Sequence, residues 1–131
     1  MLLDTSGLLC CSDKDDPRHD NAEALFYRAP TLLTHSYVLA EFVPLCNTRG
    51  LDRTRALDFA ADLTANPDVE VIWVDKPLHL SALAFLRSRP DKNYSLCDAV
   101  SFILMRRRGI TDALTTDRHF EREGFVRLLK P

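Results

Sequence analysis

The sequence lacks the cysteine and glycine patterns that mark disulfide-stabilised, zinc-binding or fibrous proteins. Its four cysteines are Cys10, Cys11, Cys46 and Cys97, and no two of them have C-x-x-C spacing. Glycine is also scarce, with 4 residues among 131, which excludes collagen-like and glycine-rich low-complexity chains. We therefore expect free, buried thiols in a reducing environment rather than a disulfide framework.

Long uncharged runs and an excess of basic residues are absent as well. No segment approaches the roughly 20 apolar residues that a membrane-spanning helix needs. The apolar N-terminus is interrupted at Asp4 and no basic segment precedes it, which is unlike a signal peptide. We therefore expect a cytoplasmic protein with no membrane partner. Because the net charge is −2, a polyanion must be held by a local basic patch or by metal ions.

The length and composition fit one globular domain over residues 1–131. The chain is 46% hydrophobic and 27% charged, which is typical of a folded protein with its own core. No internal repeat or interdomain linker interrupts it. A polar stretch at Ser12–Asp20 is expected to be a loop, after a turn or short helix that ends at Cys11.

Strand-like and helical segments alternate along the chain. The expected strands are Met1–Leu3, Thr31–Leu33, Val69–Val74, Asp112–Thr116 and Val126–Leu129. The expected helices are Asn21–Arg28, Ser36–Thr48 with a kink at Pro44, Asp52–Ala65, Pro77–Arg87, Ser95–Arg108 and a short helix from Arg118. Val69–Val74 has the strongest strand pattern, and only the last two strands are close enough for a hairpin. This alternation predicts an α/β fold with a mostly parallel sheet flanked by helices on both faces.

Four carboxylates stand in apolar surroundings. Asp4 and Asp117 end predicted strands, while Glu41 and Asp98 lie in helices that are otherwise apolar around them. In an open parallel sheet, ligands bind outside the carboxyl ends of the strands, where the strand order reverses. Since an unpaired buried charge is very costly, these acids must be neutralised by protonation, by cations or by metal.

Simpler roles are open for each acid taken alone. Asp4 and Asp117 could cap the helices that follow them. Ser95 and Asp98 fit a capping box, in which the Asp98 carboxylate bonds back to the Ser95 amide.

Capping does not explain Glu41, which lies in the middle of its helix. Its simpler role is an ion pair with an arginine such as Arg49 or Arg55. No lysine or arginine lies within the apolar segments that carry Asp4, Glu41 and Asp98, and Arg118 is the one plausible partner next to Asp117.

A cluster of carboxylates is the ligand set that Mg²⁺ or Mn²⁺ prefers over zinc. The histidines show no i, i+4 pair, so no histidine-based metal site is expected; they are His19, His35, His79 and His119. A carboxylate-held Mg²⁺ suits phosphate chemistry, because the ion neutralises phosphate charge and delivers a water.

In order, the segments "LLDTSGLL", "HDNA", "SYVLAEF", "YSLCDAVSFILM" and "ALTTDRHFEREGF" resemble those of PIN-domain ribonucleases, in particular the VapC-type toxins of toxin–antitoxin pairs. The resemblance covers almost the whole chain. It implies a PIN-like fold, an endoribonuclease that hydrolyses RNA phosphodiester bonds with a metal-activated water, a cognate antitoxin as partner, and a homodimer.

The resemblance also assigns residues to the site. It implies that Asp4, Glu41, Asp98 and Asp117 are the catalytic acids and hold Mg²⁺ or Mn²⁺. The polar side chains expected beside them are Thr5, Ser6, Thr116 and Asn93. Local turn bonding to the backbone is an equal alternative for the hydroxyls.

Basic residues that could contact RNA are Lys14, Lys92, Arg118 and the run that starts at Arg106. The run Arg106–Arg108 has a second explanation, since arginines in the last turn of a helix complement its dipole.

Two other functions compete with the nuclease. One is a PIN-like module that has lost catalysis and binds only protein or RNA, although intact acids at all four positions argue against it. The other is a phosphoryl-transfer domain of the receiver type, which needs an acceptor aspartate on a central strand with a lysine opposite. The nearest match is Asp75 with Lys76 adjacent, which is a poor one.

Overall fold

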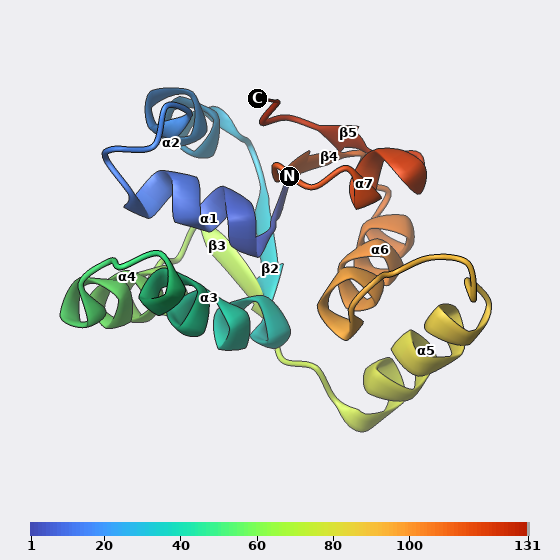
Figure 1. Cartoon of the computed structure of the whole chain (residues 1–131). Helices are drawn as coiled ribbons and strands as arrows, with labels where there is room; N and C mark the ends of the chain where they lie inside the picture. The colour runs from blue at the N-terminus through green and yellow to red at the C-terminus, as the bar shows by residue number, and fades with distance from the viewer. Residues whose placement is uncertain (131) are drawn as a thin grey trace.

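The computed structural model describes residues 1–130, which alternate between strands and helices as the sequence predicts (Figure 1). The strands are β1 (Leu2–Leu3), β2 (Leu32–His35), β3 (Val69–Ile72), β4 (Asp112–Leu114) and β5 (Val126–Arg127). The helices are α1 (Thr5–Ser12), α2 (His19–Arg28), α3 (Ser36–Thr48), α4 (Arg53–Ala65), α5 (Lys76–Arg87), α6 (Leu96–Arg108) and α7 (His119–Arg122). Among these residues, no helix is both long enough and apolar enough to cross a bilayer.

The strands form one parallel sheet in the order β3-β2-β1-β4-β5. The first strand therefore lies at the centre, where Leu2 pairs with Leu33 on one side and with Ala113 on the other. Strand order reverses between β1 and β4, because β2 and β3 extend the sheet in one direction and β5 extends it in the other. The predicted α/β class is confirmed. The last two strands run parallel, with α7 between them, so the possible hairpin is not formed.

Alternate residues of each central strand pack against helices on opposite faces of the sheet. Leu3 and Leu114 belong to one buried cluster, together with residues of α1, α2, α3 and α4. Leu2 and Ala113 belong to a second cluster, with residues of α5, α6 and α7. Figure 1 shows these two groups of helices on either side of the sheet. This is the period-two alternation expected of strands that are buried on both faces.

The structure differs from the sequence prediction at several boundaries. The strongest strand pattern, Val69–Val74, becomes the edge strand β3, and Trp73 just beyond it is 63% exposed. The polar loop is shorter than predicted, because α1 continues to Ser12 and α2 begins at His19. At Ser36–Thr48, by contrast, α3 has the predicted limits, with Pro44 inside it. The residues at which β3 and the polar loop differ from the prediction are exposed or only partly buried, so local preference alone sets these limits poorly.

α1 crosses β4 so closely that only glycine fits at one position. A Cβ built on Gly7 would overlap the carbonyl group of Leu114. In the same region, the Asp4 amide donates to the Leu114 carbonyl at 3.2 Å. The missing side chain of Gly7 therefore sets how near the start of α1 lies to the end of β4.

We predict that Gly7→Ala lowers the free energy of unfolding by about 3 kcal/mol or more, because the added methyl must displace backbone rather than a flexible side chain. Urea unfolding measures this. Gly50→Ala is the matched control: its added Cβ meets nothing within 4 Å, although its φ of 74° is strained. We expect the control to cost roughly 1 kcal/mol. Equal stability of the two variants would contradict this account of the α1–β4 contact.

Candidate metal centre

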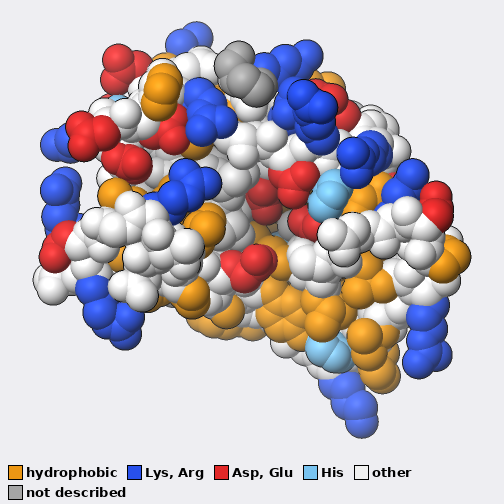
Figure 2. All heavy atoms as spheres, in the orientation of Figure 1, with side chains coloured by type: hydrophobic (Ala, Val, Ile, Leu, Met, Phe, Trp, Pro, Cys, Tyr) orange, Lys and Arg blue, Asp and Glu red, His pale blue; other side chains and the backbone are white. Residues whose placement is uncertain are grey.

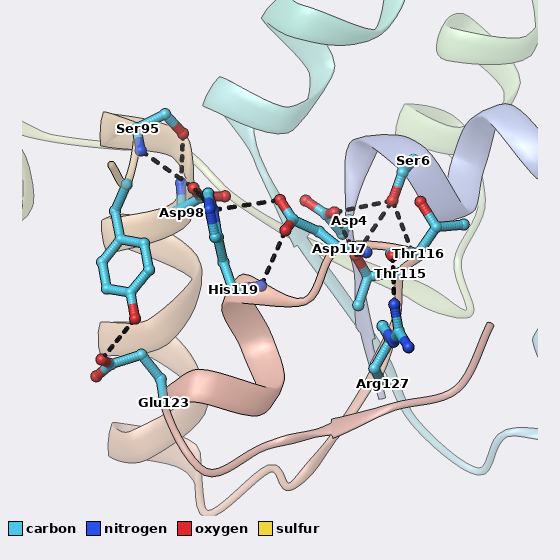
Figure 3. Close-up of polar contacts among 11 residues, drawn as sticks. Asp4, Ser6, Ser95, Asp98, Thr115, Thr116, Asp117, His119, Glu123 and Arg127 are labelled. Carbon is cyan, nitrogen blue, oxygen red and sulfur yellow. Dashed lines mark hydrogen bonds and ion pairs between the residues drawn. The ribbon is translucent and has the colours of Figure 1, made fainter. Parts of the chain in front are cut away.

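Three of the four predicted acids meet at the carboxyl edge of the sheet, where the strand order reverses (Figure 3). Asp4 directly follows β1, and Asp117 lies three residues beyond the end of β4. Asp98 lies in the first turn of α6, which faces the same edge. The crevice between β1 and β4 is the position at which open α/β sheets bind their ligands.

Asp4 is held by side chains rather than by a helix cap. It occupies the N-cap position of α1, but its carboxylate makes no capping hydrogen bond, so capping does not explain it. Instead, Oδ2 accepts from Thr115 Oγ1 at 2.7 Å and from Ser6 Oγ at 3.1 Å. Both bonds within the described residues end on Oδ2, which leaves Oδ1 available for a ligand.

The environment of Asp4 disfavours its charged form. Burial raises the pKa of Asp4 to about 6, and the nearby charge of Asp98 adds to the increase, while the hydrogen bonds from Thr115 and Ser6 oppose it. No lysine or arginine among residues 1–130 forms an ion pair with this carboxylate. A buried acid without a cation is a group that a metal ion would stabilise.

Asp98, Asp117 and His119 converge on one point. His119 Nδ1 lies 3.1 Å from Asp98 Oδ2 and 3.4 Å from Asp117 Oδ2. One ligand atom from each residue lies within 4.8 Å of the others, a spacing that one metal ion can bridge. Figure 3 shows the imidazole between the two carboxylates.

Local bonding fixes the two acids without using all their oxygens. The capping box is present: Ser95 Oγ accepts from the Asp98 amide at 3.0 Å, and Asp98 Oδ2 accepts from the Ser95 amide at 3.1 Å. Asp117 Oδ1 accepts from the His119 amide at 2.9 Å. Capping and ligand binding are therefore compatible, because a cap that binds one oxygen orients the other.

His119 is the residue that the sequence interpretation missed. The absence of an i, i+4 histidine pair argued against any histidine at the site, but His119 reaches Asp98 across 21 positions of the chain. It is the group among residues 1–130 that can carry positive charge and contacts both Asp98 and Asp117 directly. Protonated, it pairs with both acids; neutral, its Nδ1 is a possible metal ligand.

Glu41 is exposed, so the expectation of a buried mid-helix acid is wrong. It belongs to a partly solvent-facing side of α3, while Val38 and Phe42 point into the core. No ion pair among the described residues joins it to Arg49 or Arg55.

Cys97 links Glu41 to the rest of the site. Burial raises the pKa of the Cys97 thiol far above its usual range, and the nearby carboxylates of Glu41, Asp4 and Asp98 raise it further. Glu41 and Cys97 also line one pocket, in which Glu41 is exposed and Cys97 is buried. Asp4 and Asp98 are buried, whereas the side chain of Asp117 is 37% exposed.

The predicted polar neighbours are only partly in contact with the acids. Ser6 bonds Asp4 and also accepts from the Thr116 amide at 3.0 Å. The hydroxyl that reaches Asp4 is that of Thr115, not the predicted Thr116. Thr5 Oγ1 is buried and has no hydrogen-bond partner among the residues that the structure describes. Asn93 is exposed in the loop before α6, and no hydrogen bond within residues 1–130 joins it to an acid.

The predicted RNA-contacting cations occupy different parts of the surface. Arg118 is exposed directly beside Asp117, and Lys92 is exposed near the start of α6, where it pairs with Asp91 at 3.5 Å. Lys14 lies beyond the C-terminal end of α1, the end remote from Asp4. Arg106 is bound to the Glu123 carboxylate at 2.9 Å.

A second polar cluster, centred on Glu123, contacts His119 through the Tyr94 ring. The side chain of Glu123 is 6% exposed and accepts from Arg89, Arg106 and, at 2.9 Å, Tyr94. Burial alone raises the pKa of Glu123, but these hydrogen bonds outweigh burial and hold the pKa below its usual range. The Tyr94 ring packs edge-on against His119, with centroids 5.0 Å apart.

Comparison with known proteins identifies the family to which this geometry belongs. The PIN domain profile matches residues 1–126. The chain belongs to the PIN domain family. It is 32% identical over 127 residues to the 23S rRNA-specific endonuclease VapC20 of two Mycobacterium tuberculosis strains, covering 96% of this chain and 95% of the relative.

The fold agrees with that relationship. The crystal structure of M. tuberculosis VapC20, described as a sarcin–ricin loop cleaving toxin, superposes with a TM-score of 0.86 at 33% identity, covering 99% of this chain and 98% of VapC20. The predicted family, a PIN domain of the VapC type, is therefore confirmed. The predicted enzyme class, an endoribonuclease, is the class named for these relatives.

The donor set fits a divalent cation. Carboxylate oxygens dominate it, which suits Mg²⁺ or Mn²⁺, and an imidazole nitrogen favours Mn²⁺ over Mg²⁺. Asp4, Asp98 and Asp117 are held by hydrogen bonds before any ion binds, so ion binding needs little rearrangement.

We predict that Asp4→Asn stabilises the metal-free protein at neutral pH. The pKa of Asp4 is about 6 in the fold against 3.8 as the ordinary value, so its contribution to stability is present below about pH 4 and lost as pH rises through 6. Asparagine removes that loss, which is worth up to about 3 kcal/mol.

Thermal unfolding in chelator checks this prediction. The advantage of Asp4→Asn is expected to grow from pH 5 to pH 7 and to shrink when Mn²⁺ is added, because only the carboxylate gains from the ion. Asp62→Asn, at an exposed position of α4, is the control and should show neither effect. A stability difference between Asp4→Asn and the wild type that does not change with pH would contradict the raised pKa of Asp4.

We also predict that His119→Ala weakens Mn²⁺ binding by roughly 10-fold or more, and Mg²⁺ binding much less, because it removes the one nitrogen donor of the site. Isothermal titration calorimetry with each ion measures both affinities. His19→Ala, on α2, is the matched control. Equal loss for the two ions would show that His119 is not a ligand.

Proposed function

We propose that this chain is a metal-dependent endoribonuclease and the toxin of a toxin–antitoxin pair. The observation that carries the proposal is the convergence of Asp4, Asp98 and Asp117 at the reversal of strand order in a PIN fold. The inactive-module alternative has no support in this geometry, since the acids are present and oriented toward one another. The receiver-type alternative does not agree with the family.

Asp4, Asp98, Asp117 and, from the rim, Glu41 would hold Mg²⁺ or Mn²⁺. A divalent ion in such a site neutralises phosphate charge, lowers the pKa of a water for attack on phosphorus, and stabilises the leaving oxygen. The residues of this chain provide the geometry for that chemistry.

The side chains around the acids have separate tasks. Thr115 and Ser6 fix one oxygen of Asp4, and Ser95 fixes one oxygen of Asp98, so each carboxylate keeps a defined direction. His119 can hold or release a proton at Nδ1 between Asp98 and Asp117. Arg118, exposed next to Asp117, would bind the phosphate backbone of RNA.

The substrate proposal follows from the relatives. VapC20 is named for cleavage of 23S rRNA, and its structure for cleavage of the sarcin–ricin loop. We propose a structured or single-stranded RNA as substrate, with 23S rRNA as the first candidate. A net charge of −2 is compatible with this, because an ion in the acidic site and the nearby Arg118 and Lys92 offset repulsion locally.

The remaining partners are also part of the proposal. A cytoplasmic toxin of this type would form a homodimer and be inhibited by a cognate antitoxin protein. Both follow from the family relationship.

Incubation of total bacterial RNA with the purified protein and Mg²⁺ or Mn²⁺ tests the activity. Discrete fragments are expected from the wild type, and Asp117→Asn is expected to reduce cleavage by at least about 100-fold, because a ligand of the ion is lost. Asp62→Asn is the control and should cleave as the wild type does. Undiminished cleavage in chelator, or by a folded Asp117→Asn protein, would overturn the metal-dependent mechanism.

Expression in bacteria tests the toxin role. Induction of the wild type is expected to arrest growth, and Asp117→Asn or co-expression of an antitoxin to relieve the arrest. Normal growth at a demonstrated level of active enzyme would contradict the role as a toxin.

A further inference from the structure

An apolar pocket of about 310 Å³ opens directly beside the acidic site. It lies between α3 and the first turns of α5 and α6, and its walls include Tyr37, Ala40, His79 and Leu96. Mostly apolar atoms face the pocket. Figure 2 shows a continuous hydrophobic surface immediately below the acidic side chains that gather in the middle of the visible face.

The rings of Tyr37 and His79 form one wall of the pocket and hold each other in place. The Tyr37 hydroxyl is hydrogen-bonded to His79 Nδ1, and the rings meet edge to face, with centroids 5.9 Å apart and an angle of 82°. This bond joins α3 to α5 and uses a polar atom of each ring. Tyr37 also packs edge-on against the buried His35, at a centroid distance of 6.3 Å. The wall is therefore ordered before any ligand arrives, which reduces the entropy cost of binding.

The pocket shares its inner wall with the acidic site. Glu41 and Cys97 line it, and Cys97 directly precedes Asp98 in the first turn of α6. Ser95 lines it too, and its hydroxyl caps the amide of Asp98. A ligand that places a phosphate at the acids would therefore place its next apolar group at this opening.

Size and chemistry favour one occupant. A volume of about 310 Å³ is at the small end of ligand sites and suits one flat ring system rather than a helix or a strand. No lysine or arginine lines the pocket, so it does not fit a second phosphate. RNA that is recognised in single-stranded form presents unstacked bases, which bind by stacking on aromatic and imidazole rings.

We propose that this pocket receives one unpaired nucleobase of the RNA, next to the phosphate that is cleaved. This inference rests on the proposed ribonuclease function and adds to it a base-binding site built by Tyr37, His79 and Leu96. The pocket thereby selects RNA whose base at that position is free to leave its stack.

The test combines pocket variants with modified substrates. A short RNA that the wild type cleaves is compared with versions that carry an abasic residue at each position flanking the cleaved bond. The variants are Tyr37→Leu, which removes the ring, and Ala40→Phe, which fills the pocket from an exposed position of α3 without removing core packing. Tyr37→Phe keeps the ring, and Tyr27→Leu, at a tyrosine that is 78% exposed on α2, is the remote control.

On intact RNA, Tyr37→Leu and Ala40→Phe are expected to lower kcat/KM by about 10-fold, mainly through KM, because one base–aromatic contact is lost. Tyr37→Phe should retain most activity and Tyr27→Leu all of it. On one abasic substrate, the wild type should lose the same factor, and the pocket variants should lose nothing more.

Two results would contradict the base-binding role of the pocket while leaving the ribonuclease proposal intact. In one, the variants lose the same factor on every abasic substrate as on intact RNA. In the other, cleavage is unchanged while dimer formation or antitoxin binding weakens, which would assign the surface to a protein partner. If the wild type cleaves no RNA at all, the ribonuclease proposal fails, and the pocket inference fails with it.

Discussion

The pairing of β1 with β4 is the constraint on which the site depends. It places residues from the two ends of the chain side by side, so that the Thr115 hydroxyl can bond the Asp4 carboxylate across 111 positions at 2.7 Å. Gly7 allows α1 to start close enough to β4 for Ser6 to join the same network. Without this pairing, the carboxylates would have no common position.

The sequence was sufficient for the fold class and for placing Asp4, Asp98 and Asp117 at one edge of the sheet, because each acid ends or begins an element whose apolar pattern is clear. It was insufficient where position depends on how elements pack. Thr115 and Thr116 are equivalent in local pattern, and only the register of β4 against β1 decides which hydroxyl reaches Asp4. The same holds for His119, whose partner lies on another helix. Glu41 was wrongly expected to be buried, because an apolar helix in a small domain still has an exposed side.

Two neighbouring networks of polar contacts stabilise this region from opposite sides. The acids are anchored from the sheet side by Thr115 and Ser6, whereas His119 is supported from the opposite side by Tyr94 and, through it, by Glu123 with its two arginines. The charge of Glu123 is compensated by Arg89 and Arg106, whereas no arginine or lysine among the described residues pairs with the carboxylates of the site. The structure thus separates a neutralised acid that stabilises from uncompensated acids that remain available to bind.

The central position of β1 has a consequence for biosynthesis. Leu2 of β1 pairs with Ala113 of β4, which is synthesised 111 residues later. A ribosome-bound chain therefore cannot close the middle of its sheet, or bring Asp4 to Asp117, until β4 and Asp117 have emerged. Such long-range pairing is slow relative to local helix formation. Until then the acids lie apart from one another, so the topology that builds the site also delays its assembly.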